Sequence, residues 1–164
     1  LGMSQPTVHR YLNLLETSYL LIRLAAYSPN RGKRLVKSPK LFWGDVGLAL
    51  FLSGETPDGA QLENLVLLEL LLWADTFRGQ AQVSHWRGLD GVEVDFVIDL
   101  DGRLLPVEVK AATDVRLRDC GGLHAFADEY GEAALPGLLL YDGDETKWLS
   151  ARVLALPWWR VAAP

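Results

Sequence analysis

The sequence predicts an α/β fold in which a mixed central sheet is flanked by helices and is preceded by a partial winged-helix segment. The order of the expected elements supports this prediction, because a helix, three strands, a second helix and a further strand follow one another after residue 54. Antiparallel hairpins come first and a crossover helix follows, so the sheet mixes strand directions. The 164 residues, 49% hydrophobic and 23% charged, are typical of a globular chain with a sizeable core.

Residues 1–53 are expected to form the partial winged-helix segment. They begin like the second half of a helix-turn-helix, with Ser4 as the N-cap and Pro6 in the first turn. Two short strands, at 20–27 and 41–43, then flank a basic, turn-rich loop of the kind that forms a wing. Because the chain does not begin with Met and the supporting upstream helices are missing, we expect an N-terminal truncation.

The charge distribution is uneven, which bears on the partner. The net charge is −5, yet residues 1–43 hold seven Lys and Arg against the single acid Glu16. This asymmetry indicates a polyanion partner, docking of the basic segment on the acidic body, or an ordinary solvated face. The residues expected to bind DNA are Arg10, Arg31, Lys33, Arg34, Lys37 and Lys40.

The second domain is expected to span residues 54–164. A short helix capped by Asp45 and a linker rich in Gly and Pro precede it, which places the boundary after residue 53. Its expected elements are a largely buried helix at 60–77, a strand at 83–87, a hairpin at 93–110, a helix within 114–131, an apolar strand at 135–141, and closing segments at 146–149 and 153–161.

The hairpin is the most informative feature of the chain. Its turn, Asp-Gly at residues 101–102, is a two-residue signal that fixes the register of the flanking strands. The pairs on the apolar face are then Leu100 with Arg103, Ile98 with Leu105, Phe96 with Val107, and Val94 with Val109. Pro106 lies opposite Val97 at a pair without hydrogen bonds, so the proline is compatible with the pairing.

The other face of the hairpin carries charged residues. The register sets Asp95 directly opposite Glu108, and Glu93 opposite Lys110. Facing like charges destabilise a hairpin, so these carboxylates indicate a cation between them, and Mg²⁺ or Mn²⁺ is expected. Lys110 can orient a water at that metal and offset charge on a phosphoryl oxygen, which is phosphodiester hydrolysis chemistry. Glu93 can hold Lys110 in place or add a ligand.

A further carboxylate, Glu63, lies in the otherwise apolar helix. Burying it is costly without a partner, which a metal or Lys110 would provide. The alternative is a position in the first helical turn that points to solvent.

The composition also excludes several classes of protein. The single cysteine, Cys120, excludes an intramolecular disulfide and a cysteine-based zinc site. The chain contains neither a run of about 18 apolar residues nor a signal peptide, so we expect a cytoplasmic protein without a membrane partner.

The candidate site resembles that of the PD-(D/E)XK nuclease superfamily. The match consists of Glu63, the run Gly91-Val-Glu-Val-Asp95-Phe-Val-Ile, and the run Val107-Glu-Val-Lys110. The resemblance implies a restriction-endonuclease-like fold, with Asp95 and Glu108 as metal ligands, Lys110 as the catalytic lysine and Glu63 as the helical acid.

Other runs are similar to the domain of unknown function 4143, which follows an ATPase module in prokaryotic AAA-type ATPases. These runs are Ser38-Pro-Lys-Leu-Phe-Trp-Gly-Asp45, Leu62-Glu-Asn-Leu-Val, His85-Trp-Arg87, Glu93-Val-Asp-Phe-Val-Ile and Leu156-Pro-Trp-Trp159, and the resemblance covers essentially the whole chain. It implies DNA and an ATPase module of the same protein as partners. The chain lacks a Gly-x-x-x-x-Gly-Lys-Ser/Thr motif, so we expect no ATP site in it.

These patterns together predict a Mg²⁺- or Mn²⁺-dependent DNA phosphodiester hydrolase domain from the C-terminal part of an AAA-type ATPase. The first alternative is a non-catalytic module that binds DNA or regulates the ATPase. The second is a purely structural domain whose carboxylates are balanced by Lys110 and Arg87.

Overall fold

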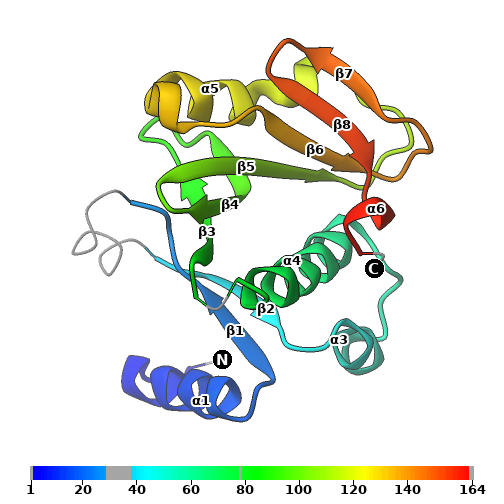
Figure 1. The fold of residues 1–164 in the computed structure, drawn as a ribbon. Helices are drawn as coiled ribbons and strands as arrows, with labels where there is room; N and C mark the ends of the chain where they lie inside the picture. The colour runs from blue at the N-terminus through cyan, green and yellow to red at the C-terminus, as the bar shows by residue number, and fades with distance from the viewer. Residues whose placement is uncertain (1, 29–37, 78, 163–164) are drawn as a thin grey trace.

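A six-stranded sheet forms the centre of the computed structural model, which describes residues 2–28, 38–77 and 79–162 (Figure 1). Its strands are β3 (Ala81–Arg87), β4 (Glu93–Leu100), β5 (Arg103–Lys110), β6 (Gly137–Tyr141), β7 (Lys147–Ser150) and β8 (Val153–Pro157). The spatial order is β3-β4-β5-β6-β8-β7. β3, β4 and β5 are antiparallel, β5, β6 and β8 are parallel, and β7 is antiparallel to β8. The predicted mixed α/β sheet is therefore confirmed.

Helices cover both faces of this sheet. α4 (Gly59–Asp75) packs on one face and α5 (Gly121–Tyr130) on the other (Figure 1). The remaining helices are α1 (Gln5–Thr17), α3 (Val46–Ser53), α6 (Trp159–Ala162) and the short 3₁₀ helices η1 (Leu117–Cys120) and η2 (Gly131–Ala133). No helix in the described ranges is both long and apolar enough to span a bilayer.

The start of α4 is fixed by a reciprocal cap. The Asp58 carboxylate accepts a hydrogen bond from the Ala60 backbone N–H at 2.7 Å, and the Gln61 side chain accepts one from the Asp58 N–H at 2.9 Å. The helix is less buried than its apolar sequence predicts, because Leu72 and Trp73 near its end are exposed.

The side chains of β4 divide the core into two clusters. Phe96 and Ile98 pack with Leu67 of α4, whereas Val97 packs with Phe126 of α5. This alternation follows from the two-residue period of a strand.

The turn between β4 and β5 forms as the sequence predicts. Asp101 and Gly102 have φ angles of 52° and 83°, and both positive values are what a type I′ turn requires. The expected pairs Leu100–Arg103, Ile98–Leu105 and Phe96–Val107 are confirmed, as is Pro106 opposite Val97.

The register beyond Phe96 differs from the prediction. Val97 pairs with Ser84, and Val94 pairs with Trp86. Between these two pairs the chain advances by three residues in β4 but by two in β3, so β4 carries one extra residue, a β-bulge. The bulge turns Val94 toward the α5 side of the sheet, and the expected pairing of Val94 with Val109 is wrong.

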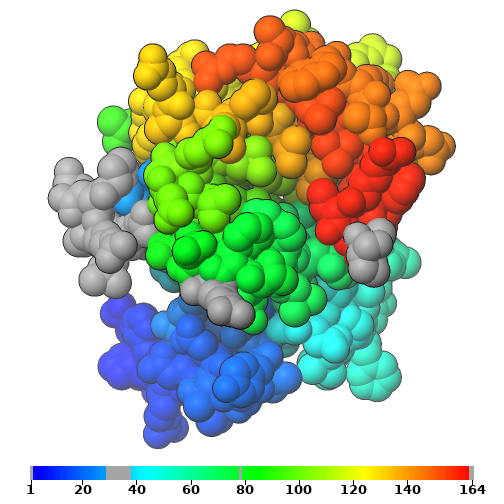
Figure 2. All heavy atoms as spheres, viewed as in Figure 1, coloured from blue at the N-terminus to red at the C-terminus, as the bar shows by residue number. Residues whose placement is uncertain are grey.

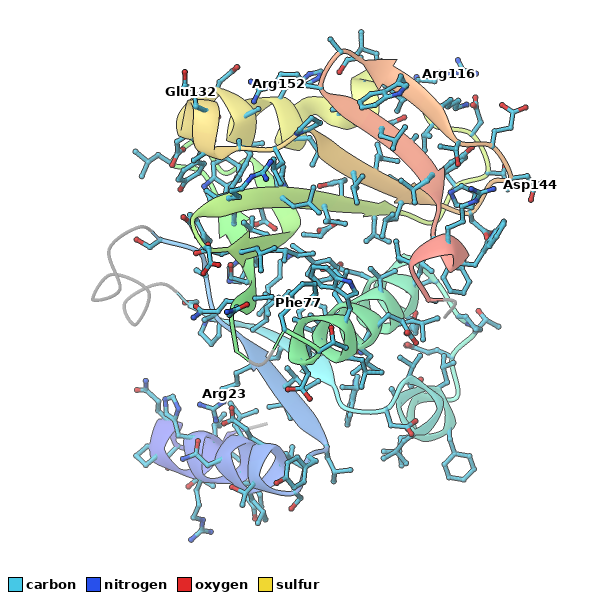
Figure 3. All side chains as sticks on the ribbon, in the orientation of Figure 1. Arg23, Phe77, Arg116, Glu132, Asp144 and Arg152 are labelled. Carbon is cyan, nitrogen blue, oxygen red and sulfur yellow. The ribbon has the colours of Figure 1, made fainter. Side chains whose placement is uncertain are left out.

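The N-terminal residues form a helix and a two-stranded sheet of their own. α1 starts after Ser4, as expected, and β1 (Leu21–Leu24) pairs antiparallel with β2 (Lys40–Trp43). Arg23 of β1 lies beside α1, with its Nε 3.0 Å from Glu16 Oε2 (Figure 3). The segment's place in the molecule is visible in Figure 2, where its blue atoms lie at the opposite end from the yellow and orange atoms of α5 and β7.

This two-stranded sheet packs on the α4 side of the large sheet. Leu24 and Phe42 are buried in the same core cluster as Leu67 and Phe96. Ala26 also forms a parallel bridge with His85 of β3. Strand β2 is thereby held against α4 and the start of β4, which places Lys40 at the candidate site.

Candidate functional site

Charged side chains from five elements meet where β4 begins and β5 ends. We call this group the carboxylate cluster. Its members are Lys40 of β2, Glu63 of α4, Arg87 of β3, Glu93 and Asp95 of β4, and Glu108 and Lys110 of β5. The structure therefore brings together every predicted catalytic, metal-binding and secondary residue, and adds Lys40.

Asp95 lies at the bulge and ends the pairing of β4 with β5. The regular ladder stops at Phe96–Val107, and beyond it the Asp95 Oδ2 atom accepts a hydrogen bond from the Val109 backbone N–H at 2.9 Å. Asp95 and Glu108 are thus not the directly opposed ladder pair that the register predicts. The bulge directs the Asp95 carboxylate toward Lys40 and Glu63 instead.

Glu108 is the most enclosed carboxylate of the cluster, with a side chain that is 12% exposed. Its Oε1 atom accepts a hydrogen bond from Lys110 Nζ at 2.6 Å. Its Oε2 atom is buried and has no hydrogen-bond partner among the described residues. Burial, followed by repulsion from Asp95, raises the pKa of Glu108 to about 7. A buried acceptor without a donor requires an explanation, and a bound cation provides one.

Lys110 is held by the carboxylate two residues before it. Burial alone would lower the pKa of Lys110, but the hydrogen bond and charge of Glu108, with the charge of Asp95, outweigh burial and raise it above its ordinary value. The ammonium therefore stays protonated at neutral pH.

Lys40 lies among three carboxylates. Its Nζ is 3.2 Å from Glu63 Oε1, 3.5 Å from Asp95 Oδ1 and 3.6 Å from Glu93 Oε2. Burial would lower the pKa of Lys40, but Glu63, Asp95 and Glu93 raise it. Lys40 is also one of the residues expected to contact DNA, and its ammonium is engaged within the protein in this structure.

Glu63 points into the cluster, so the alternative of a solvent-facing position in the first turn of the helix is wrong. Its partner is Lys40, at 3.2 Å. Burial and repulsion from Asp95 raise the pKa of Glu63, and Lys40 opposes this change.

Glu93 does not pair with Lys110, because the bulge shifts the register of β4. It instead makes an ion pair with Arg87, its neighbour on β3, with 3.2 Å between Arg87 Nε and Glu93 Oε1. Both side chains are more exposed than those of Asp95 and Glu108.

The carboxylate cluster offers four carboxylates as possible donors to a divalent cation. Carboxylate oxygens are the donors that Mg²⁺ and Mn²⁺ prefer. The Oε2 atom of Glu108, which has no hydrogen-bond partner among the described residues, and the Oδ1 atom of Asp95 are donors of this type. No group of three His, Cys, Asp or Glu in the described ranges is arranged to hold a metal ion. The donor atoms thus suit the ion in their chemistry, but the described side chains are not arranged around an ion position, and the ammonium of Lys40 lies beside Asp95 Oδ1.

Asn64 is a residue of the site that the sequence reasoning missed. It is buried, accepts a hydrogen bond from the Trp43 backbone N–H at 2.8 Å, and donates one to the Trp43 carbonyl at 2.9 Å. This clamp fixes β2, and hence Lys40, against α4. A polar side chain beside Glu63 in an apolar helix was the sequence signal for it.

Of the six residues expected to bind DNA, the structure describes only Arg10 and Lys40, and these lie on different elements. Arg10 is exposed on α1, and Lys40 lies in the carboxylate cluster. The other four, Arg31, Lys33, Arg34 and Lys37, lie outside the described residues. A pocket of about 350 Å³, lined in part by Lys40 and Glu63, lies beside the cluster between β2, α3 and α4.

Comparisons with known proteins place this chain in a family. The family model with the description Domain of unknown function (DUF8612) matches residues 1–59. Two uncharacterized proteins, from Mycobacterium bovis and Mycobacterium tuberculosis, are each 29% identical to the chain over 119 residues, which are 67% of this chain and 26% of the relative. The chain thus spans about a quarter of the length of these curated relatives, and no solved structure matches it. The model described as Domain of unknown function (DUF4143) matches residues 58–161, more than half of the chain, so the chain belongs to that family.

Proposed function

We propose that this chain is a metal-dependent phosphodiester hydrolase domain that acts on DNA, with an active site like that of the PD-(D/E)XK nucleases. The observation that carries the proposal is the buried Glu108 carboxylate next to Asp95, which has one oxygen bound to Lys110 and the other without a partner among the residues that the structure describes. Glu63 of α4 completes the set of residue types that this chemistry uses. The mixed sheet with a helix on each face is compatible with a restriction-endonuclease-like fold.

The cluster can divide the work of hydrolysis among its side chains. When bound, a divalent ion would supply charge that polarises the phosphate and acidifies the attacking water. Asp95 and Glu108 would hold it. Lys110, protonated and fixed by Glu108, would stabilise negative charge developing on a phosphoryl oxygen. Glu63, whose pKa is raised by burial and by Asp95, is suited to accept the proton of the water.

We also propose that the full-length protein carries an AAA-type ATPase module and that residues 1–53 are part of a winged helix. The matched region is only 26% of each curated relative, which leaves room for a further module in proteins of this kind. The helix and two-stranded sheet at the N-terminus are the elements that a partial winged helix would contain.

One observation favours the non-catalytic alternative, a DNA-binding or ATPase-regulating module. Each of the four carboxylates already has a cationic partner, because Lys40 or Arg87 contacts Glu63, Glu93 and Asp95 and Lys110 contacts Glu108. A cluster of paired charges can be purely structural, because paired charges are the ordinary state of buried carboxylates.

A cleavage assay separates these functions. The chain is incubated with plasmid and linear DNA in Mg²⁺ or Mn²⁺, beside Lys110→Ala and a control, Lys147→Ala, whose ion pair with Asp114 lies outside the cluster. We expect metal-dependent cleavage that falls about 100-fold or more in Lys110→Ala and is kept in the control. DNA that is retarded in a gel but never cut, with no Mg²⁺ binding by calorimetry, would refute the hydrolase and support the non-catalytic module.

A further inference from the structure

Lys40 reaches the carboxylate cluster from a separate part of the chain. It lies on β2, within the residues matched by the DUF8612 model, whereas its three partners lie on α4 and β4, within the DUF4143 match. The ammonium has oxygens of Glu63, Glu93 and Asp95 within 3.6 Å. An inorganic cation is likewise surrounded by several carboxylates, although at coordination distances that are shorter than these ion-pair distances.

The position of Lys40 is built into the fold. The next-but-one residue, Phe42, is buried in the core, and the following residue, Trp43, is clamped through its backbone by Asn64. Only 26% of the Lys40 side chain is exposed, so its ammonium is partly desolvated and its long stem is ordered. The burial of Phe42 and the hydrogen bonds of Asn64 thus fix the backbone around Lys40, which distinguishes it from the lysine of a mobile surface ion pair.

An ammonium and a divalent ion compete for the same oxygens. Asp95 Oδ1 is an expected metal ligand and a partner of Lys40, and two positive charges a few ångströms apart repel each other strongly in a half-buried site. We propose that Lys40 is a tethered competitor of the metal, so that a divalent cation binds the cluster by displacing the Lys40 ammonium. This inference rests on the metal-binding part of the proposed function and not on hydrolysis.

The competition couples the N-terminal segment to the site. Lys40 lies on β2, which forms one sheet with β1, so displacing its ammonium removes the ion pairs that join this sheet to α4 and β4. Coupling of this kind is reciprocal, so a partner that pulls β2 away from α4 raises the metal affinity of the cluster. Residues 1–59 thereby regulate the site contained in 58–161.

Metal affinity in matched variants tests the competition. Calorimetry with Mn²⁺ is carried out on the unaltered chain, on Lys40→Met, on Lys40→Arg, which keeps the charge, and on Lys147→Met as a control outside the cluster. We expect Lys40→Met to bind Mn²⁺ at least about tenfold more tightly, which corresponds to about 1.4 kcal/mol. Lys40→Arg and Lys147→Met stay within about threefold of the unaltered chain. Equal affinity in Lys40→Met and the unaltered chain would overturn the inference.

A second measurement needs no substitution and distinguishes displacement from a general charge effect. Amine labelling of the unaltered chain, read by mass spectrometry, reports how accessible each lysine is with and without Mn²⁺. We expect saturating Mn²⁺ to increase labelling of Lys40 several-fold and to leave Lys147 unchanged. Protection of Lys40 that persists at saturation would show that the ammonium stays in place, and the inference would fail.

These outcomes separate the inference from the proposed function. Tighter Mn²⁺ binding in Lys40→Met without any DNA cleavage would keep the competition and refute the hydrolase. Cleavage by the unaltered chain with no effect of Lys40→Met on affinity would refute the competition alone. An absence of Mn²⁺ binding in every variant would refute both.

Discussion

Replacing Glu108 by Gln tests the central electrostatic feature of the cluster. Burial and the neighbouring Asp95 charge raise the pKa of Glu108 from 4.5 to about 7 in the folded protein. The folded state therefore holds this proton more tightly than the unfolded state. The stabilisation is fully present below pH 4.5, decreases as the pH rises, and is lost above about pH 7.

The difference between 4.5 and about 7 corresponds to about 3 kcal/mol, most of which falls between pH 5 and pH 8. Urea unfolding at these two pH values, with a chelator present, measures it. We expect the unaltered chain to lose about 2 to 3 kcal/mol more than Glu108→Gln over this range. Glu132→Gln, at an exposed glutamate near the outer end of α5, is the control and should follow the unaltered chain (Figure 3). Equal losses in Glu108→Gln and the unaltered chain would refute the reasoning.

Two further predictions concern the supports of the site, and urea unfolding measures both. Gly122→Ala should destabilise the fold by at least about 2 kcal/mol, because the added Cβ would collide with the backbone carbonyl of Glu93. The control is Gly121→Ala, where the added Cβ has no neighbouring atom within 4 Å, and its stability should stay within about 1 kcal/mol of the unaltered chain. A similar cost at both glycines would contradict this packing. Asn64→Ala should cost about 2 kcal/mol, because it removes both hydrogen bonds to the Trp43 backbone, and a loss below about 0.5 kcal/mol would show that the clamp is unimportant.

Local patterns in the sequence were sufficient for much of the fold. The Asp-Gly turn set the hairpin register because a two-residue loop with two positive φ angles leaves only one pairing near the turn. Ser4 and Asp45 stand at the N-cap positions of α1 and α3, as expected, although only the Asp45 carboxylate accepts a capping hydrogen bond, from the Leu48 backbone N–H. Gly122, at the start of α5, is needed for packing, because an added Cβ would collide with the backbone carbonyl of Glu93.

Prediction from the register failed where distant segments meet. A bulge in β4 shows no signature in the local alternation of residues, because it is fixed by the pairing of β4 with β3. It moved Val94 to the α5 side and placed Asp95 at the end of the β5 ladder. Glu93 consequently found Arg87 instead of Lys110.

By itself, the sequence determined the elements of this protein, the register next to its tight turn, and the residue types that gather at the site, because these depend on neighbours along the chain. Only the tertiary structure decided which charges face each other. Lys40 is separated from Asp95 by 55 positions in the chain, and its ammonium reaches the carboxylates because the packing of β2 on α4 carries it there. Burial, which no local pattern specifies, raised the pKa of the Glu108 carboxyl and left one of its oxygens without a hydrogen-bond partner in the described part of the chain.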